Sequence, residues 1–308
     1  MNNSAKNGGN VNLNWETNII NSTFTNSIAE NGPAIYAQAE ISIEDSIFEN
    51  LVGSTNGAIV SEKYMEITNC IFMNNTGTWG ASIYSKGTLN IRNSSFSNSK
   101  SKYASAIYAE GNITVSDSIF ENMYANETAG AVGLRDMDII KIINCTFINS
   151  EARKNGGAIY IDINRNPNTT TSIVKSTFIN STGDFGGALV QLGGILIIEN
   201  STFTENTAIY AGSAVFISNG MMGIGNCSFE SNRILYKEIY GGGTLYCDKT
   251  YFLSIYLTFK DNDGNAIYGY DANLTINDSE FERNGEAIHC VFCQVILNDN
   301  VYNDDILI

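Results

Sequence analysis

The sequence predicts an all-β fold, a single-stranded right-handed parallel β-helix of about eleven to twelve coils with about 24 residues per coil. One Phe returns at a nearly constant interval, apolar and polar residues alternate before each copy of it, and turns rich in Asn, Gly and Ser separate the apolar segments. Apolar spacing of three and four residues over three turns, the helical pattern, is not found.

The recurring Phe gives the length of the repeat. The first five copies are 24 residues apart: Phe24, Phe48, Phe72, Phe96 and Phe120. The later copies have looser steps: Phe147, Phe178, Phe203, Phe229, Phe259 and Phe281. Tyr302 is interpreted as a twelfth copy, because Val295 and Leu297 precede it at the usual offsets. Successive coils of such a fold stack about 4.8 Å apart, so equivalent residues should lie on top of one another.

Each repeat is predicted to contain three short strands. The first has apolar residues seven and five positions before the Phe, such as Leu89 and Ile91 before Phe96. The second carries the Phe, and the third is an Ala-Ile-Tyr element such as Ala106-Ile107-Tyr108. The Ile of this element is aliphatic in every copy, so we expect it inside, with its Ala and Tyr neighbours outside.

Asn residues mark the turns. In the first seven coils an Asn stands two residues after the Phe, and from Phe203 onward it stands three residues after. Asn tolerates positive φ better than most residues, and stacked amides hydrogen-bond along a ladder. We therefore expect ladders of Asn side chains along the turns.

These units resemble the repeats of chlamydial-type polymorphic membrane proteins and related adhesin-like β-helix proteins. The marks of that family are Gly-Gly-Ala-Ile, present at 156–159, and Phe-x-x-Asn, present from Phe203 to Asn206 and in three later coils. The first seven coils have Phe-x-Asn instead. The resemblance covers about residues 15–305 and implies a β-helix on a cell surface, while the membrane-anchoring barrel of that family has no counterpart here.

The predicted organisation is an N-terminal lead-in or partial coil at 1–14 and a parallel β-helix at 15–308. Loop insertions are expected near 162–172 and 233–243, where two coils are longer than the rest. Because an uncapped solenoid exposes a strand edge, we expect further chain or another subunit to cover its ends.

Composition excludes several classes of partner. The chain has 308 residues, 32 acidic and 17 basic side chains and a net charge of −15. This charge argues against binding to nucleic acid, which requires clustered Lys and Arg. A run of 18 apolar residues, the length that a membrane-spanning helix needs, is absent from the sequence.

The six cysteines do not suggest a disulfide framework. Cys70, Cys145 and Cys227 share a small inward column but lie three coils apart, roughly 14 Å, which exceeds disulfide reach. Cys247 and Cys290 lie two coils apart and should not pair either. Cys290 and Cys293 form a CxxC that a local disulfide can close; a zinc site is disfavoured because the chain has a single His.

Several sequons fit a glycosylated outer surface. Those outside the column three residues before the Phe are Asn74, Asn112, Asn126, Asn168 and Asn180. The repeat itself also creates sequons, so they do not require glycosylation. Together with the low charged fraction they favour a secreted or cell-surface protein, which requires that the native N-terminal signal be missing, since residues 1–9 have no apolar segment.

Candidate chemistry is concentrated near the C-terminal end. Asp278 and Glu280 alternate with inward residues, and Asp299 is expected one coil along from Asp278. Paired carboxylates suit acid–base cleavage of polysaccharides or Ca²⁺ binding, although an acidic face also discourages edge pairing. His289 is the single His and replaces a Tyr of the outward column. No metal site or cofactor is otherwise predicted.

An outward aromatic column is the best candidate binding surface. It comprises Tyr36, Tyr84, Tyr108, Tyr160, Phe216, Tyr246 and Tyr268. Such a face can stack on sugar rings or accept a protein partner, or serve only stability. The first hypothesis is therefore a non-enzymatic structural or adhesive module that binds a partner or a surface glycan. The alternatives are a polysaccharide lyase or hydrolase using Asp278, Glu280 and Asp299, and a scaffold subunit of a large assembly.

Overall fold

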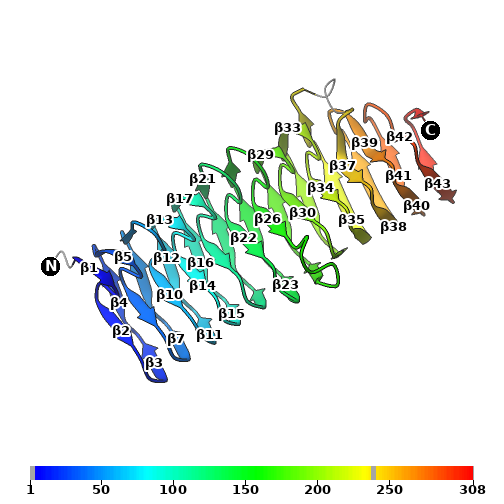
Figure 1. Cartoon of the computed structure of the whole chain (residues 1–308). Coiled ribbons are helices and arrows are strands. Elements are labelled where there is room, and N and C mark those ends of the chain that lie inside the picture. The colour runs from blue at the N-terminus through cyan, green and yellow to red at the C-terminus, as the bar shows by residue number, and fades with distance from the viewer. Residues whose placement is uncertain (1–3, 237–240, 308) are drawn as a thin grey trace.

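The computed structural model describes residues 4–236 and 241–307, and it is an elongated solenoid with its termini at opposite ends (Figure 1). Strands stack in parallel into three sheets that enclose one core. Helices are absent from the described residues. The predicted parallel β-helix is confirmed.

The first sheet, called the short sheet, has 10 strands. They are β1 (Ser4–Asn7), β5 (Ile28–Asn31), β9 (Val52–Gly53), β13 (Thr76–Trp79), β17 (Lys100–Tyr103), β21 (Tyr124–Ala125), β25 (Glu151–Ala152), β29 (Thr182–Phe185), β33 (Thr207–Ala211) and β36 (Arg233–Ile234). These strands were not predicted; four of them have only two residues, too few to show alternation.

The second sheet, called the Tyr sheet, carries the Ala-Ile-Tyr elements and has 13 strands. They are β2 (Val11–Leu13), β6 (Ile35–Ala37), β10 (Ile59–Ser61), β14 (Ile83–Ser85), β18 (Ile107–Ala109), β22 (Val132–Arg135), β26 (Ile159–Asp162), β30 (Leu189–Leu192), β34 (Val215–Ser218), β37 (Gly243–Asp248), β39 (Asn265–Tyr270), β42 (Ile288–Val291) and β45 (Ile306–Leu307).

The third sheet, called the Phe sheet, has 22 strands in two adjoining files. The file before the Phe is β3 (Thr17–Ile20), β7 (Ile41–Glu44), β11 (Met65–Thr68), β15 (Leu89–Arg92), β19 (Ile113–Ser116), β23 (Ile139–Ile143), β27 (Thr170–Val174), β31 (Ile195–Glu199), β40 (Asn273–Asn277) and β43 (Gln294–Asn298). The file with the Phe is β4 (Thr23–Thr25), β8 (Ile47–Glu49), β12 (Ile71–Met73), β16 (Ser95–Ser97), β20 (Ile119–Glu121), β24 (Thr146–Ile148), β28 (Thr177–Ile179), β32 (Thr202–Thr204), β41 (Glu280–Glu282) and β44 (Val301–Tyr302). Two long strands, β35 (Met221–Glu230) and β38 (Tyr251–Lys260), run through both files. Each complete coil thus has four strand segments rather than the three predicted.

The register of the Phe ladder agrees with the repeat. Phe72 pairs with Phe48 on one side and Phe96 on the other, and its ring lies 4.7 Å from both. Tyr302 continues the ladder, 5.2 Å from Phe281. From Phe48 to Phe281 the ladder rings are fully buried, so they form the centre of the core.

The Ala of the Ala-Ile-Tyr element is not outside, contrary to the prediction. Ala34, Ala106 and Ala158 are fully buried and belong to the core cluster. Alternation fails there because the strand begins only at the Ile, after a residue with positive φ such as Gly32 or Ala104. The Ile is inside, as predicted.

Asn side chains form two kinds of ladder. Asn98, Asn122, Asn149 and Asn180 have positive φ and exposed side chains, and each amide after the first donates to the preceding Oδ1 at 2.8–3.1 Å. The later Asn206, Asn232 and Asn262 occupy the next position, which points inward, and are buried. The shift from Phe-x-Asn to Phe-x-x-Asn is therefore a change from an exposed to a buried ladder.

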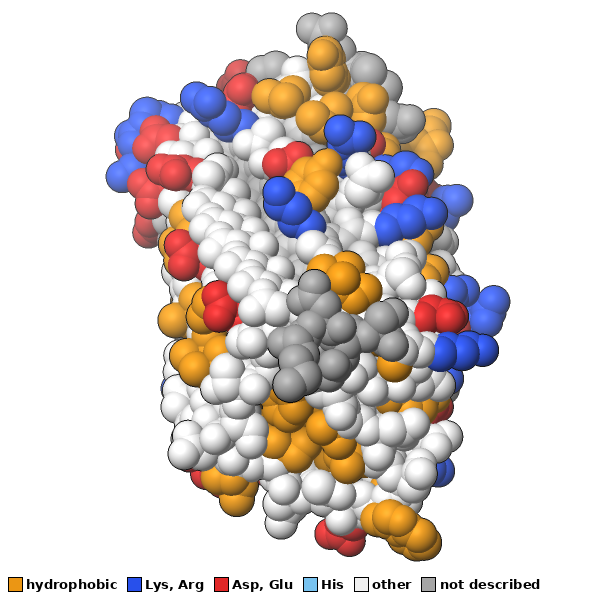
Figure 2. All heavy atoms as spheres, turned by 90° about the vertical axis from the view of Figure 1, so that its left-hand side faces the viewer, with side chains coloured by type: hydrophobic (Ala, Val, Ile, Leu, Met, Phe, Trp, Pro, Cys, Tyr) orange, Lys and Arg blue, Asp and Glu red, His pale blue; other side chains and the backbone are white. Residues whose placement is uncertain are grey.

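Strands are present within the predicted lead-in and beside both predicted insertions. Within 1–14, β1 and β2 already pair with β5 and β6, so this segment forms part of the first coil. The insertion near 162–172 is the connection between β26 and β27. The insertion near 233–243 includes residues 237–240, which lie outside the described residues. Hydrophobic side chains are visible at the N-terminal end (Figure 2).

Candidate functional site

The aromatic column of the Tyr sheet is in register, as predicted. Tyr84 pairs with Tyr108, and Phe216 with Tyr246 and then Tyr268. The rings of Tyr84 and Tyr108 lie 5.7 Å apart, and those of Tyr246 and Tyr268 lie 4.9 Å apart. Tyr36 and Tyr160 hold the equivalent positions on β6 and β26.

The rings of the Tyr column are more buried than those of a flat, exposed ladder would be. Tyr108 is 8% exposed, Tyr246 8% and Tyr268 7%. The rings pack outside the main core in two separate clusters. The first aromatic cluster is Trp79, Tyr84, Tyr108 and Tyr160 with Ala104 and Ala129. The second aromatic cluster is Phe185, Phe216, Tyr246 and Tyr268 with Ala211 and Val291.

Aromatic residues at the ends of short-sheet strands cover the column, and the sequence reasoning missed them. Trp79 stacks on Tyr103 at 4.1 Å and meets Tyr108 edge-on at 4.8 Å. Phe185 meets Phe216 edge-on at 5.4 Å. A signal was present, since Trp79 and Tyr103 each precede a Tyr of the column by five residues. The corner between two sheets, which the sequence pattern does not show, brings the two columns together.

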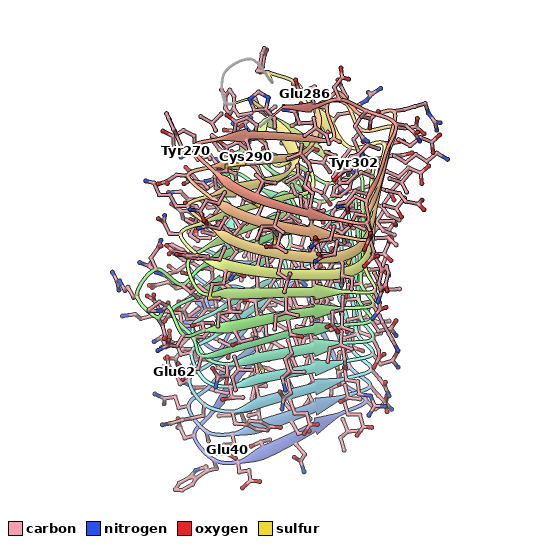
Figure 3. All side chains as sticks on the ribbon, turned by 90° about the vertical axis from the view of Figure 1, so that its right-hand side faces the viewer. Glu40, Glu62, Tyr270, Glu286, Cys290 and Tyr302 are labelled. Atoms are coloured by element: carbon pink, nitrogen blue, oxygen red, sulfur yellow. A yellow bond between two sulfur atoms is a disulfide. The ribbon has the colours of Figure 1, made fainter. Side chains whose placement is uncertain are left out.

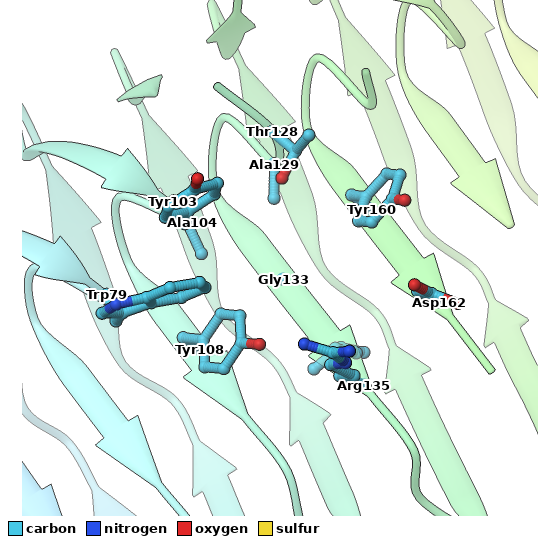
Figure 4. A pocket seen from close by; sticks show the side chains of 11 residues that line it. Trp79, Tyr103, Ala104, Tyr108, Thr128, Ala129, Gly133, Arg135, Tyr160 and Asp162 are labelled. Carbon is cyan, nitrogen blue, oxygen red and sulfur yellow. The ribbon is translucent and has the colours of Figure 1, made fainter. Parts of the chain in front are cut away.

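A gap in the column opens a cavity in the first aromatic cluster. Gly133 on β22 stands between Tyr108 on β18 and Tyr160 on β26, so one coil has no ring. The cavity measures about 230 Å³ and is open to solvent. Figure 4 shows the bare backbone at Gly133, with the rings of Tyr108 and Tyr160 on either side. Val60 and Val190 also interrupt the column, but each fills its position with a buried side chain.

The rim of this cavity carries polar groups. Arg135 and Asp162 occupy paired positions on β22 and β26. The guanidinium of Arg135 lies 3.4 Å from the carboxylate of Asp136, which also faces Arg165 at 3.4 Å. Arg135 also hydrogen-bonds the phenol of Tyr108. The single cation of the lining therefore already pairs with a neighbouring carboxylate, which it shares with Arg165.

The phenols of this cluster stay protonated at neutral pH. Burial raises the pKa of Tyr160 to about 12. Burial also raises the pKa of Tyr108, although the hydrogen bond from Arg135 opposes the shift. Burial and the nearby Glu110, which accepts a hydrogen bond from the phenol at 3.1 Å, raise the pKa of Tyr84. These hydroxyl groups can thus donate and accept hydrogen bonds without ionising.

A second cavity, of about 440 Å³, borders the second aromatic cluster. Phe185, Phe216, Tyr246 and Tyr268 line it together with Asp248. The carboxylate of Asp248 accepts a hydrogen bond from Ser218 at 2.7 Å. The two clusters therefore give the Tyr sheet two aromatic depressions along one face.

The predicted C-terminal carboxylates lie apart from both cavities. Asp278 and Asp299 have positive φ and stand one above the other in an exposed turn column. Glu280 is exposed on β41, in the Phe sheet. No group of three or more His, Cys, Asp and Glu able to hold a metal ion is found among the described residues.

His289 continues the aromatic column at its C-terminal end. Its ring stacks on Tyr268 at 5.1 Å, and Nδ1 lies 2.7 Å from the carboxylate of Glu286. Glu286 and the nearby Cys290 lie on the last coils (Figure 3). The position of His289 in the outward column agrees with the prediction, and the ring extends the stack by one coil.

The cysteines that the repeat places too far apart to pair are free thiols, as predicted. Cys70, Cys145, Cys227 and Cys247 are buried free thiols. Cys290 and Cys293 form a disulfide, which settles the option that the spacing left open. Gly269 gives it room, because a Cβ there would lie 2.7 Å and 3.0 Å from the two sulfur atoms.

The predicted glycosylation sites differ in exposure. Asn74, Asn126, Asn168 and Asn180 are exposed. Asn180 uses its amide to donate to Asn149 in the turn ladder. Asn112 is half-buried, and its Oδ1 accepts hydrogen bonds from the backbone of residues 138 and 139. Asn74, Asn126 and Asn168 thus remain the most accessible candidates.

Within the described ranges, no helix is long and apolar enough to cross a membrane.

Comparison with known proteins identifies the family. A family model of the right handed beta helix region matches residues 7–167. Metabotropic glutamate receptor-like protein R of Dictyostelium discoideum is 32% identical over 151 residues, which are 46% of this chain and 9% of that protein. The chain therefore spans only a small part of this relative.

A solved structure gives a weaker likeness. A mannuronic acid specific polysaccharide family 6 lyase from human gut microbiota aligns with a TM-score of 0.31 and 10% identity, over 96% of this chain and 76% of that one. These values are too low to support an argument about function.

The narrower resemblance to chlamydial-type polymorphic membrane proteins stays a prediction. Because the family model matches more than half of the residues, the chain belongs to the right-handed β-helix family.

Proposed function

We propose that this protein is a non-enzymatic binding module of a secreted or cell-surface protein, and that the outer face of its Tyr sheet binds glycans. The observation that carries the proposal is the pair of aromatic clusters, each beside an open cavity on the same face. Sugar rings have apolar faces that stack on aromatic side chains, while their hydroxyl groups need polar partners at the rim. Both kinds of group are present here.

The location rests on two further features. The Cys290–Cys293 disulfide suits an oxidising compartment, where disulfides persist. Exposed sequons at Asn74, Asn126 and Asn168 suit passage through a secretory route. An adhesive role follows from a rigid solenoid that presents aromatic depressions along one face.

The test is a binding measurement on single variants. Tyr108→Ala and Tyr246→Ala each remove a ring from one aromatic cluster and should weaken binding to glycan oligosaccharides, measured by calorimetry. Tyr251→Ala is the matched control, because Tyr251 is 64% exposed on β38 of the Phe sheet. Equal binding by all three variants would contradict the proposal.

A further inference from the structure

We infer that the cavity at Gly133 is a subsite for one hexopyranose ring of a neutral glycan, held between Tyr108 and Tyr160. The inference rests on the proposed function and deepens it. It names the position on the Tyr sheet, the size of the unit bound and its charge.

The spacing of the coils fits one ring. Tyr108 and Tyr160 stand two coils apart, which is roughly 10 Å. A ring placed midway would lie about 5 Å from each phenol ring, a favourable stacking distance. The cavity of about 230 Å³ is below the usual range for drug-sized ligands, about 300–1,000 Å³, and so suits a single ring.

The backbone is adapted to keep this gap open. Ala104 and Ala129 have φ values of 55° and 61°, a region that disfavours residues with a Cβ, while Gly156 and Gly186 hold the equivalent place in the following coils. The methyl groups of Ala104 and Ala129 line the cavity beside Gly133. A Cβ at residue 133 would lie 3.0 Å from the Cβ of Ala104 and 3.4 Å from that of Ala129. The two methyl groups and Cδ2 of Tyr108, 3.3 Å from the same point, thus crowd a Cβ at residue 133, while the space farther out between the two phenol rings stays open.

The charges around the cavity favour a neutral ring. Arg135 is its one lining cation, and Asp136 already pairs with it. Asp162 lies on the same rim, and Glu110 lines the adjoining depression with Arg135. A uronic acid would meet these carboxylates with like charge, and Arg135 is the single lining cation available to offset it. Hydroxyl groups of a neutral ring can instead bond to Arg135, Asp162 and the Tyr160 phenol.

The experiment fills the gap and leaves the rest of the face intact. A104G/G133Y places a ring at residue 133, and the Gly at 104 removes the closest contact to its Cβ, so that only smaller shifts of the Tyr108 ring and the Ala129 methyl are needed. A104G alone is the matched control, because it relaxes a positive φ and leaves the cavity open. Thermal denaturation of both variants reports whether they fold. The probes are neutral gluco-, manno- and galacto-configured hexamers and a mannuronate hexamer, titrated by calorimetry.

At least one neutral hexamer should bind the original protein and A104G, with roughly tenfold weaker binding to A104G/G133Y. Tyr160→Ala, which removes the far wall, should weaken the same binding and serves as the second variant if A104G/G133Y does not fold. Neutral binding that survives A104G/G133Y and Tyr160→Ala but is lost in Tyr246→Ala overturns this subsite and leaves the proposed function standing. Preference for mannuronate also overturns it. Binding of no probe overturns the proposed function itself.

Discussion

At the scale of single residues, the Phe ladder shows how far spacing alone determines structure. A Phe every 24 residues predicted a buried stack, and adjacent rings from Phe48 to Phe203 lie 4.7–4.9 Å apart with nearly parallel planes. The orientation of the Ala before each Ile was not predictable in the same way. In coils such as those of Ala34 and Ala106, a positive φ two residues before the Ala overrides simple alternation.

Phe96→Ala should destabilise the protein by about 3–5 kcal/mol, because it empties a fully buried position between two stacked rings. Chemical denaturation followed by circular dichroism measures the change in the free energy of unfolding. Phe292→Ala is the matched control, since Phe292 is 80% exposed and should change stability by less than about 0.5 kcal/mol. Similar losses in the two variants would contradict the ladder's role.

At the scale of elements, the buried Asn ladder joins the coils of the second half. The amide of Asn232 donates to the carbonyl of Phe203, and its Oδ1 accepts from the backbone and side chain of Asn206. The sequence showed that Asn moves by one place after Phe203 but not that the new place is buried. The short-sheet strands were missed for a related reason: a two-residue strand exists only through its neighbours in adjacent coils.

Asn232→Leu should cost about 2–4 kcal/mol, because it removes the side-chain partners of the buried Phe203 carbonyl and the buried backbone N–H of Asn206. Asn232→Ser should cost less, since Ser99 occupies the same column and its Oγ accepts a hydrogen bond from the backbone N–H of Asn75 at 3.3 Å. Urea denaturation of both variants compares the two losses. A Leu variant as stable as the Ser variant would show that the ladder contributes packing alone.

The Tyr column could be predicted from the sequence, but the aromatic residues that cover it and the cavity beside it could not. The Tyr column follows from register within one sheet. Trp79 ends β13 and Tyr103 ends β17. Both reach the Tyr column only because the chain turns a corner after each strand and continues into the Tyr sheet. The cavity depends in addition on Gly133, whose missing ring matters only when its neighbours on adjacent coils are known.

At the scale of the whole molecule, buried titratable groups set the alkaline limit of stability. Burial raises the pKa of Cys70, Cys145 and Cys227 from 9.0 to about 11. Between these values the unfolded chain loses thiol protons that the folded chain keeps, so stability falls as pH rises. The contribution is complete below about pH 9 and is lost through about pH 11.

The free energy of unfolding should therefore decline from pH 9 to pH 11, by roughly 2–3 kcal/mol for each thiol. Replacing the three thiols by Ser should leave stability near pH 7 little changed, because Ser94 fills the same column and donates to the Arg92 carbonyl at 2.9 Å. Plots of the denaturation midpoint against pH compare the original protein with this triple variant. An unchanged decline in the triple variant would assign it to Cys247 and the buried phenols, whose pKa values burial also raises.

One incubation separates binding from cleavage. Neutral and mannuronate hexamers are held with the intact protein, bound ligand is measured by calorimetry and products are followed by mass spectrometry. We predict binding of a neutral hexamer with no shortened product, and the same result for Asp278→Asn, Glu280→Gln and Asp299→Asn. Shortened oligosaccharides that disappear in those variants would contradict the binding role and establish a polysaccharide-cleaving enzyme.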